Sequence, residues 1–293
     1  MSMQSIYKSP AGERAVMALY DAVLADWPVS YTTRIASTRH GDTFVIASGE
    51  TCKPPLVLLH GAGSNSAIWM ADIADYAHDH RVYAVDLIGE PGKSAPNRPD
   101  WNGPAFGEWL EDVFDGLDAQ KGALLGVSQG GWAALKFATY RPQRVEKLVL
   151  LCPGGIVPDR VSFLARVILL SLLGPWGSRR IPGLLFGSVP VTKEADEFIT
   201  VTMSHFKPRV GTVPIFSDEE LRRLTMPVLL IGGERDALRD AHKIAARMEK
   251  LVPDLSSHII PGAGHVLINT TEYIAPFLAR RSLTERARRE SGP

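Results

Sequence analysis

The sequence predicts an α/β fold: a mostly parallel, doubly wound sheet of about eight strands with an inserted helical cap. Short apolar runs alternate with helix-like segments over most of the chain, which is typical of a parallel sheet covered by helices on both faces. The pentapeptide Gly126-Val127-Ser128-Gln129-Gly130 joins one of these runs to a helix-like segment. One interval of about seventy residues interrupts the alternation and is too long for an ordinary connection.

The individual elements follow from hydrophobic periodicity. Residues 11–25 have the spacing of an amphipathic helix, and residues 31–36 and 43–48 alternate like the strands of a hairpin at the sheet edge. Residues 56–59 are apolar throughout, as expected for a strand that is buried on both faces. Further strands are expected at 82–85, 123–127, 148–151, 228–231 and 257–260, and further helices at 67–78, 104–119, 130–140 and 240–251.

The long interval begins after Cys152-Pro153 and ends near Pro227. It is rich in Leu, Pro and Gly, and its helical patches lie at 161–173, 193–206 and 217–224. Ligands of open α/β sheets bind beyond the carboxyl ends of the strands, so we expect this insertion to cover the site as a helical cap. The predicted division is a core of residues 1–153 and 226–293 and a cap of residues 154–225.

The composition indicates a small-molecule partner. The chain of 293 residues has 32 Lys and Arg against 32 Asp and Glu, so no net field attracts nucleic acid or an anionic membrane. The most apolar segment, 161–176, contains Arg166 and is shorter than the roughly 20 residues that a membrane-spanning helix needs. We expect no nucleic-acid partner and no stable membrane insertion, whereas assembly into a homo-oligomer is left open.

Cysteine usage and the first residues predict a cytoplasmic protein. Cys52 and Cys152 lie far apart without metal-binding spacing, and so few thiols are typical of an intracellular chain rather than a disulfide scaffold. Residues 1–10 contain no apolar core of signal-peptide length. The arginine-rich residues 280–293 have few apolar side chains, so we expect a solvated tail there.

Ser128 is the candidate nucleophile. It lies in a G-x-S-x-G motif between a predicted strand and a predicted helix, the setting in which a serine is held on a strained turn, the nucleophile elbow, with its hydroxyl exposed. A free serine hydroxyl is a poor nucleophile at neutral pH and needs an adjacent base. The sequence therefore has to supply that base at the same edge of the sheet.

His265 and Asp236 are the candidates for base and orienting acid. His265 ends the segment Gly262-Ala263-Gly264-His265 after the last predicted strand, and Asp236 follows the strand at 228–231. Both positions are carboxyl ends of strands, as is that of Ser128, and the order Ser, Asp, His is that of a known catalytic triad arrangement. Glu234 is the local competitor of Asp236.

The segment His60-Gly61-Ala62-Gly63 is the candidate oxyanion hole, because it follows the strand at 56–59. The backbone N–H groups of Ala62 and Gln129 are the expected donors, and His60 is expected to hold the loop rather than to move protons. Gly61 and Gly63, with Phe163 and Trp176 of the cap, are candidate substrate-binding residues; the two aromatic residues could equally well pack the cap onto the sheet. The segment lacks the glycine patterns of phosphate-binding loops, and no metal or cofactor site is visible.

Five segments together resemble the α/β-hydrolase superfamily. They are HGAGSNSAIW at 60–69, DLIGEPGKS at 86–94, GVSQGG at 126–131, GGERD at 232–236 and GAGH at 262–265. Over nearly the whole chain, the sequence is most similar to small carboxylesterase-type serine hydrolases with a helical cap. The resemblance implies the fold, a triad of Ser128, Asp236 and His265, and chemistry without a cofactor. One segment departs from the usual D-x-x-G-x-G-x-S pattern, because 89–92 reads Gly-Glu-Pro-Gly, which leaves the shape of that loop open.

The expected reaction is hydrolysis of a carboxylic ester of a small, apolar substrate through an acyl-enzyme on Ser128. A serine at the elbow, rather than an aspartate, argues against haloalkane dehalogenase and epoxide hydrolase chemistry. Carbon–carbon bond hydrolysis, thioester or lactone cleavage and perhydrolysis stay open as alternatives, because the same triad serves each of them and a fold does not determine a substrate. A different class of function, a non-catalytic sensor or binding protein for a small ligand, is also left open.

Overall fold

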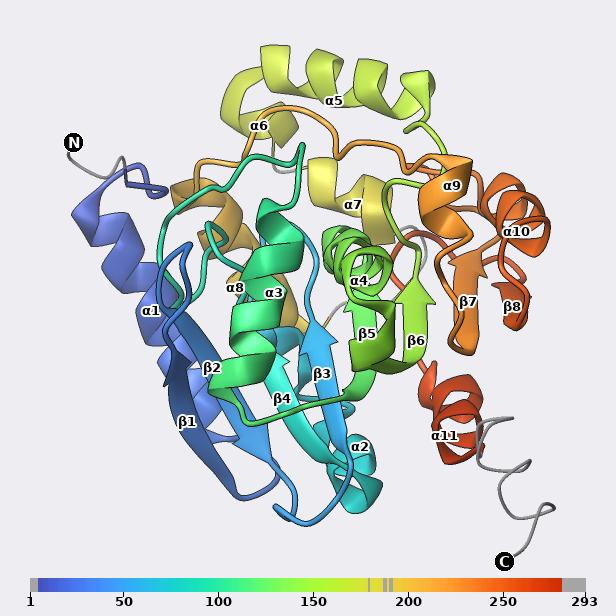
Figure 1. Cartoon of the computed structure of the whole chain (residues 1–293). Coiled ribbons are helices and arrows are strands. Elements are labelled where there is room, and N and C mark those ends of the chain that lie inside the picture. Colours follow the sequence, from blue (N-terminus) through green and yellow to red (C-terminus); the bar gives the residue numbers. More distant parts are fainter. Residues whose placement is uncertain (1–4, 179, 187–188, 190–191, 281–293) are drawn as a thin grey trace, which may run out of the picture.

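The computed structural model describes residues 5–178, 180–186, 189 and 192–280 (Figure 1). The tail expected after residue 280 lies outside these ranges. The strands are β1 (Tyr31–Ala36), β2 (Thr43–Ser48), β3 (Pro55–Leu59), β4 (Arg81–Val85), β5 (Gly122–Val127), β6 (Val145–Leu151), β7 (Val228–Gly233) and β8 (Leu255–Ile260). The α-helices are α1 (Pro10–Ala25), α2 (Ile73–Asp79), α3 (Ala105–Gly116), α4 (Gln129–Tyr140), α5 (Val161–Leu172), α6 (Gly174–Ser178), α7 (Ile181–Phe186), α8 (Lys193–His205), α9 (Asp218–Leu221), α10 (Ala241–Glu249) and α11 (Thr271–Ala279), with 3₁₀ turns η1 (Ser66–Trp69) and η2 (Pro142–Arg144).

The described strands form one sheet of eight, in the order β1-β2-β4-β3-β5-β6-β7-β8. β1 and β2 pair antiparallel, as do β2 and β4, and every other neighbouring pair is parallel. The expected mostly parallel sheet and its edge hairpin are therefore confirmed. β5, which leads to Ser128, lies between β3 and β6 at the centre of the sheet, where its backbone is held from both sides.

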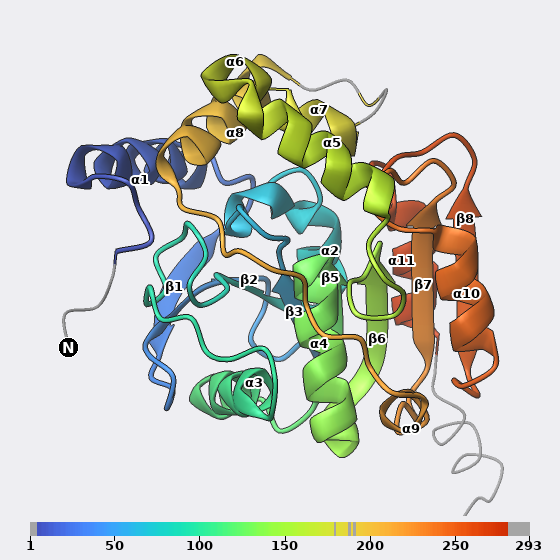
Figure 2. The ribbon, with the colours of Figure 1, turned by 90° about the horizontal axis from the view of Figure 1, so that it is seen from above.

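Side-chain alternation along the strands divides the core into two layers. Val57 and Leu59 of β3 pack in the layer that contains residues of α3 and α4, whereas Leu56 and Leu58 pack in the layer with Tyr20 of α1. All four β3 residues are fully buried, because successive side chains point to opposite faces and helices cover both (Figure 2). A continuous apolar run, rather than an alternating one, follows directly from this doubly covered position.

Several helices differ from the periodicity-based expectation. The single helix expected at 67–78 is divided into η1 and α2, because the Asn65 side chain accepts a hydrogen bond from the Ala67 N–H and caps a short first turn. The helix expected at 217–224 is shortened to α9, which starts in a capping box made by Ser217 and Glu220. The short helices α6 and α7 are not anticipated, because their segments are too rich in Gly and Pro to show a clear period.

Three helices of the long insertion lie beyond the carboxyl ends of the strands. Figures 1 and 2 show α5, α6 and α7 over this edge of the sheet, while α8 packs against α1 near a backbone bridge between Tyr7 and Phe206. Most apolar side chains of α5 are exposed, and Phe163 is its one buried residue. Within the described ranges, no helix is long and apolar enough to cross a membrane. The division into a core and a cap at 154–225 stays a prediction.

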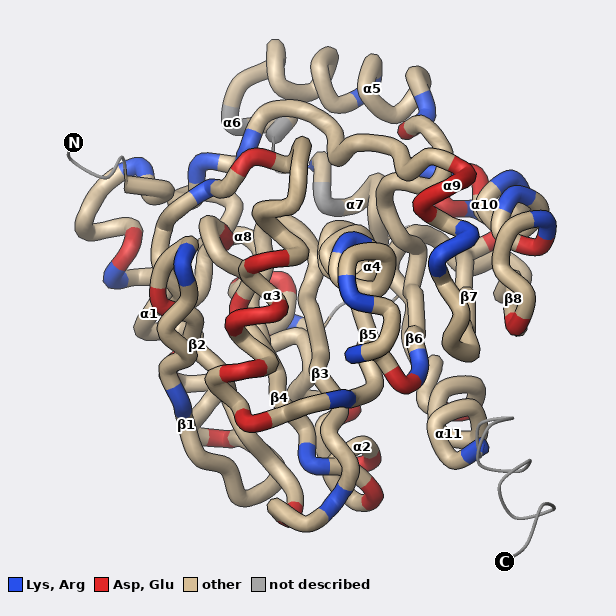
Figure 3. The backbone as a smooth tube through the Cα atoms, in the orientation of Figure 1, with Lys and Arg blue, Asp and Glu red and all other residues tan. Residues whose placement is uncertain are grey.

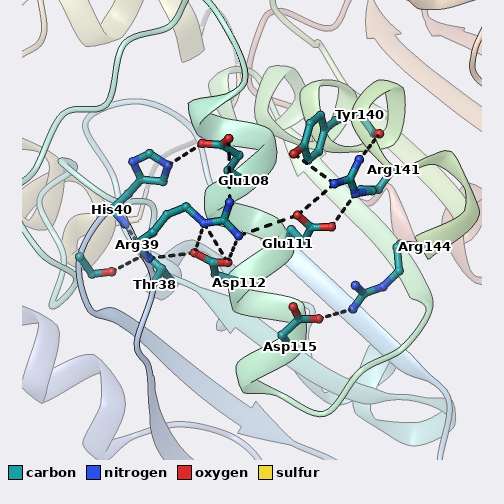
Figure 4. Close-up of polar contacts among 11 residues, drawn as sticks. Thr38, Arg39, His40, Glu108, Glu111, Asp112, Asp115, Tyr140, Arg141 and Arg144 are labelled. Carbon is teal, nitrogen blue, oxygen red and sulfur yellow. Dashed lines mark hydrogen bonds and ion pairs between the residues drawn. The ribbon is translucent and has the colours of Figure 1, made fainter.

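Acidic residues form a row on α3 (Figure 3), and their side chains face arginines from neighbouring elements (Figure 4). Arg39 Nη2 lies 2.6 Å from Asp112 Oδ1, and Arg144 Nη2 lies 2.8 Å from Asp115 Oδ1. Arg144 immediately precedes β6, so it lies at the amino end of the strand whose carboxyl end leads to the site. Such exposed ion pairs contribute about 1 kcal/mol or less each, so the burial of the sheet dominates stability.

Candidate active site

Ser128 occupies a strained turn between β5 and α4. Its φ and ψ are 52° and −109°, a conformation that costs a non-glycine residue about 1–3 kcal/mol. Hydrogen bonds hold it there: the Ser128 N–H donates to the Leu151 carbonyl at 2.9 Å, and its own carbonyl accepts from the Trp132 and Gly154 N–H groups at 3.0 and 3.1 Å. The turn is therefore anchored to both β6 and α4, which fixes the hydroxyl at the sheet edge.

The flanking glycines allow this turn to pack closely. A Cβ on Gly126 would lie 2.4 Å from the Gly130 carbonyl oxygen, and a Cβ on Gly130 would lie 2.2 Å from the Leu59 carbonyl oxygen. Both contacts are with backbone, which cannot rotate away. A side chain at either position would therefore push α4 away from β3 and β5.

Gly130→Ala is accordingly expected to lower the free energy of unfolding by about 1–3 kcal/mol or more. Urea denaturation followed by circular dichroism measures the change. Gly183→Ala is the matched control, because a Cβ on Gly183 meets no atom of the described residues within 4 Å outside the backbone of its own helix. An equal loss in both variants would contradict the packing argument.

The three candidate catalytic side chains form a chain of hydrogen bonds. His265 Nε2 lies 3.0 Å from Ser128 Oγ, and His265 Nδ1 lies 2.8 Å from Asp236 Oδ2. Asp236 and His265 are buried, with exposed fractions of 2% and 6%. Glu234 is turned elsewhere, since its Oε2 accepts a hydrogen bond from the Gly262 N–H at 2.8 Å. The structure thus brings Ser128, His265 and Asp236 together, and not Glu234.

Asp236 is held as a carboxylate. Burial alone would raise its pKa, but the hydrogen bond with His265 and the backbone N–H groups of Arg239 and Leu238 outweigh it and keep the pKa below its ordinary value. Those two N–H groups lie 3.1 and 2.7 Å from Oδ1, which leaves Oδ2 for His265. An ionised Asp236 accepts a hydrogen bond from the Nδ1–H group, so the lone pair of Nε2 faces Ser128.

The same region contains a group of potential metal ligands. Atoms of Cys152, Asp236 and His265 lie within 4.8 Å of one another, the one such group among the described residues. Burial raises the pKa of the Cys152 thiol to about 12, so it stays protonated and is a poor ligand. With His265 Nδ1 already paired to Asp236, this donor set does not suit a metal ion.

Two backbone N–H groups are the candidate oxyanion donors. Gln129 is the first residue of α4, at its positive end, and Ala62 lies in the loop after β3. Neither N–H has an acceptor among the residues that the structure describes. A Cβ built on Gly61 would lie 3.6 Å from the Ser128 Cβ, so this loop passes directly beside the serine. The arrangement suits an oxyanion that forms next to Ser128.

His60 holds that loop in one tautomer. The Leu87 N–H donates to His60 Nε2 at 2.8 Å, so Nδ1 carries the proton and donates to the Gly61 carbonyl at 2.8 Å. Burial lowers the pKa of His60. A neutral imidazole with both nitrogens engaged has no free proton to exchange, as expected for a residue that shapes the loop.

Glu90 is a buried site residue that the sequence did not single out. Its Oε2 accepts from the Gly63 N–H at 2.7 Å, and its Oε1 accepts from Gln129 Nε2 at 3.0 Å. Burial raises the pKa of this carboxyl. Glu90 thus links the loop after β3 to the first residue of α4. The only signal in the sequence was the altered glycine spacing at 89–92, whose loop brings Glu90 inward.

Glu90→Leu is expected to lower the free energy of unfolding by about 1–3 kcal/mol, because the Gly63 N–H and the Gln129 amide lose their buried acceptor. Glu90→Gln is the matched variant, since one oxygen still accepts from Gly63 and the Gln129 amide can rotate to pair with the new NH₂. Thermal denaturation compares the two; a larger loss in Glu90→Gln would contradict this account.

Arg239 is the second residue that the sequence did not indicate. Its Nη1 lies 3.5 Å from Ser128 Oγ and 3.4 Å from the Cys152 carbonyl oxygen, and its Nε lies 2.7 Å from Asp159 Oδ1. The arginine side chain is only 7% exposed. The one feature of the sequence that could have indicated Arg239 is its position, three residues after Asp236 in the same strand-end loop.

The two aromatic residues expected to bind substrate differ in their surroundings. Phe163 is buried at the base of α5, whereas Trp176 is 58% exposed. The guanidinium carbon of Arg180 lies 3.6 Å from the centre of the Trp176 ring. Their role in substrate binding stays a prediction, as does that of Gly61 and Gly63.

Comparisons with known proteins identify the family. The family model described as "Alpha/beta hydrolase family" matches residues 56–277, which span the strands and loops that carry Ser128, Asp236 and His265. The chain belongs to the alpha/beta hydrolase family. This hydrolase is 34% identical over 268 residues to carboxylesterase YbfK of Bacillus subtilis (strain 168), covering 87% of this chain and 89% of the relative.

Solved structures of carboxylesterases have the same architecture as this hydrolase. The naproxen esterase (carboxylesterase NP) of Bacillus subtilis is 30% identical with a TM-score of 0.81, and the match covers 97% of this chain and 100% of that one. Carboxylesterase CesB (YbfK) from the same organism is 31% identical, also with a TM-score of 0.81, over 92% of this chain and 97% of that one. The fold expected from the sequence is therefore confirmed along nearly the full chain.

Proposed function

We propose that this hydrolase is a serine carboxylesterase that cleaves a small ester through an acyl-enzyme on Ser128. The observation that carries the proposal is the continuous chain of hydrogen bonds from Asp236 through His265 to Ser128 Oγ, at 2.8 and 3.0 Å. The carboxylesterase names of the Bacillus subtilis relatives, which match over most of both chains, support ester hydrolysis. The protein is thus an ester-hydrolysing enzyme.

The mechanism follows from the positions of the protons. His265 Nε2 accepts the Ser128 proton as Oγ attacks the ester carbonyl carbon, and Asp236 stabilises the imidazolium that forms. The Ala62 and Gln129 N–H groups donate to the oxyanion. His265 then gives its proton to the departing alkoxide, which leaves as the alcohol. Water, deprotonated by His265, attacks the acyl-enzyme carbonyl. The bond to Ser128 Oγ then breaks, His265 returns its proton to Oγ, and the carboxylic acid leaves.

The segment 154–225 is proposed to act as a cap that selects the substrate. Its helices α5 to α7 lie beyond the strand ends that carry the triad (Figure 1), and buried Phe163 supports an apolar lining near its base. We further propose that the enzyme works in the cytoplasm on a small-molecule ester, which is supported by two unpaired thiols, Cys52 and Cys152.

Turnover and active-site labelling together test this proposal. The wild-type protein is expected to hydrolyse p-nitrophenyl butyrate and to react with a fluorophosphonate probe, with the label mapped to the peptide that contains Ser128 by mass spectrometry. If the protein is labelled but cleaves only thioesters, lactones or carbon–carbon bonds, the triad is supported and the proposed ester substrate is wrong. A folded protein that is neither labelled nor active would instead be a small-ligand binding protein.

A further inference from the structure

A buried cation lies beside the nucleophile of this hydrolase. We propose that Arg239 forms an anion subsite next to Ser128, and that the preferred substrates are esters that carry a second carboxylate a few bonds from the scissile carbonyl. Half-esters of short dicarboxylic acids are the simplest members of this class. The inference rests on the proposed esterase function and names its substrate class.

The position of the guanidinium group is the first argument. Arg239 Nη1 lies 3.5 Å from Ser128 Oγ, the atom that becomes bonded to the substrate carbonyl carbon. Any group attached to that carbon on the Arg239 side must therefore come close to the guanidinium. An arginine presents several N–H donors in a planar fork that matches a carboxylate, so this side of the site favours an anion over an alkyl chain.

The ion pair with Asp159 orients the charge rather than cancelling it at Ser128. Asp159 contacts the Nε end of the guanidinium at 2.7 Å, whereas Nη1 points to Ser128 Oγ and the Cys152 carbonyl. Nη2 has no hydrogen-bond acceptor among the described residues. The pair is thus a fixed dipole with its positive end toward the nucleophile, and the low exposure of both side chains strengthens its local field.

The strand order separates this cation from the oxyanion site. The Ala62 loop follows β3, on one side of β5 and Ser128, whereas Arg239 contacts Cys152 after β6, on the other side. Arg239 therefore cannot replace the N–H donors that face the carbonyl oxygen. Its charge faces one of the two substituents of the carbonyl carbon, which makes it a determinant of substrate choice.

A purely structural role is the alternative, in which the Arg239 and Asp159 pair only ties the loop after β7 to the start of the insertion. Two variants separate these roles, because they change the charge at Ser128 in opposite directions. Arg239→Met removes the positive end, whereas Asp159→Asn keeps Arg239 and removes its counter-charge. A structural tie would be weakened in the same way by both substitutions.

The experiment compares monoethyl succinate with ethyl butyrate, which have similar shapes but different charges, by pH-stat titration. The readout is the ratio of the two kcat/KM values, anionic over neutral. We expect Arg239→Met to lower this ratio by about 10-fold to 100-fold, the range for a lost hydrogen-bonded ion contact, and Asp159→Asn to raise it. Arg144→Met is the matched control, since Arg144 is ion-paired to Asp115 at the opposite end of β6; its ratio should stay that of the wild type.

Inhibition of the wild-type enzyme gives a measurement that needs no variant. Succinate is expected to compete with ethyl butyrate with a Ki at least about 10-fold lower than that of succinamide, which has the same shape without charge. Equal Ki values, or a ratio of kcat/KM values that moves in the same direction in Arg239→Met and Asp159→Asn, would overturn the subsite. Loss of the proposed function looks different, because the wild-type enzyme would then hydrolyse neither ester.

Discussion

Ser128→Ala is expected to lower kcat/KM for p-nitrophenyl butyrate by about 10⁴-fold to 10⁶-fold. The substitution removes Oγ, which lies 3.0 Å from His265 Nε2, and leaves in place the two N–H groups that we propose for the oxyanion. The residual rate then reflects water attack on a bound ester. Steady-state kinetics with the purified variant measures the loss.

The fold of the Ser128→Ala variant is expected to stay intact, because alanine tolerates the same backbone conformation about as well as serine. Its free energy of unfolding should change by about 1 kcal/mol or less, the value of one partly exposed hydrogen bond. Ser171→Ala is the control: its hydroxyl is exposed on α5 and, among the described residues, hydrogen-bonds only to the Val167 carbonyl. Turnover near the wild-type rate in Ser128→Ala would refute the proposed mechanism.

Asp236→Asn is the second substitution with a large expected effect, a loss of about 10⁴-fold in kcat. Asparagine keeps the shape of Asp236 but can present its NH₂ to His265 Nδ1. Nδ1 then acts as an acceptor, so the proton moves to Nε2 and His265 can no longer accept the Ser128 proton. Steady-state kinetics with p-nitrophenyl butyrate measures the decrease in kcat. Asp236→Glu, which keeps a carboxylate, should have a higher kcat than Asp236→Asn.

The same substitution changes the pH dependence of stability. The pKa of Asp236 is lowered in the folded state, so its interactions stabilise the fold above the ordinary pKa of aspartate, and this contribution is lost as the pH falls through the lowered value. The wild-type protein should therefore exceed Asp236→Asn in unfolding free energy at neutral pH, and the gap should narrow in acid. A gap that widens as the pH falls would contradict the lowered pKa.

Hydrophobic periodicity predicted the elements whose burial follows a regular pattern along the chain. Residues 56–59 form the core of β3, because helices cover both of its faces and every side chain is buried. The segment at 67–78 was predicted wrongly as one helix, since the local cap made by Asn65 closes a short turn there. The Gly- and Pro-rich segments of α6 and α7 have no clear period, so their helices depend on contacts outside the segment.

The sequence by itself determined which loops carry the candidate triad. Ser128, Asp236 and His265 each follow a predicted strand, and in a parallel sheet all carboxyl ends meet at one edge. The tertiary structure alone decided which side chains complete that edge. In the sequence, Glu90 and Arg239 resemble ordinary charged loop residues. Their roles depend on burial and on partners far away in the chain, which are Gly63 for Glu90 and Asp159 for Arg239. Burial and partnership arise only when distant segments pack together, which no local pattern encodes.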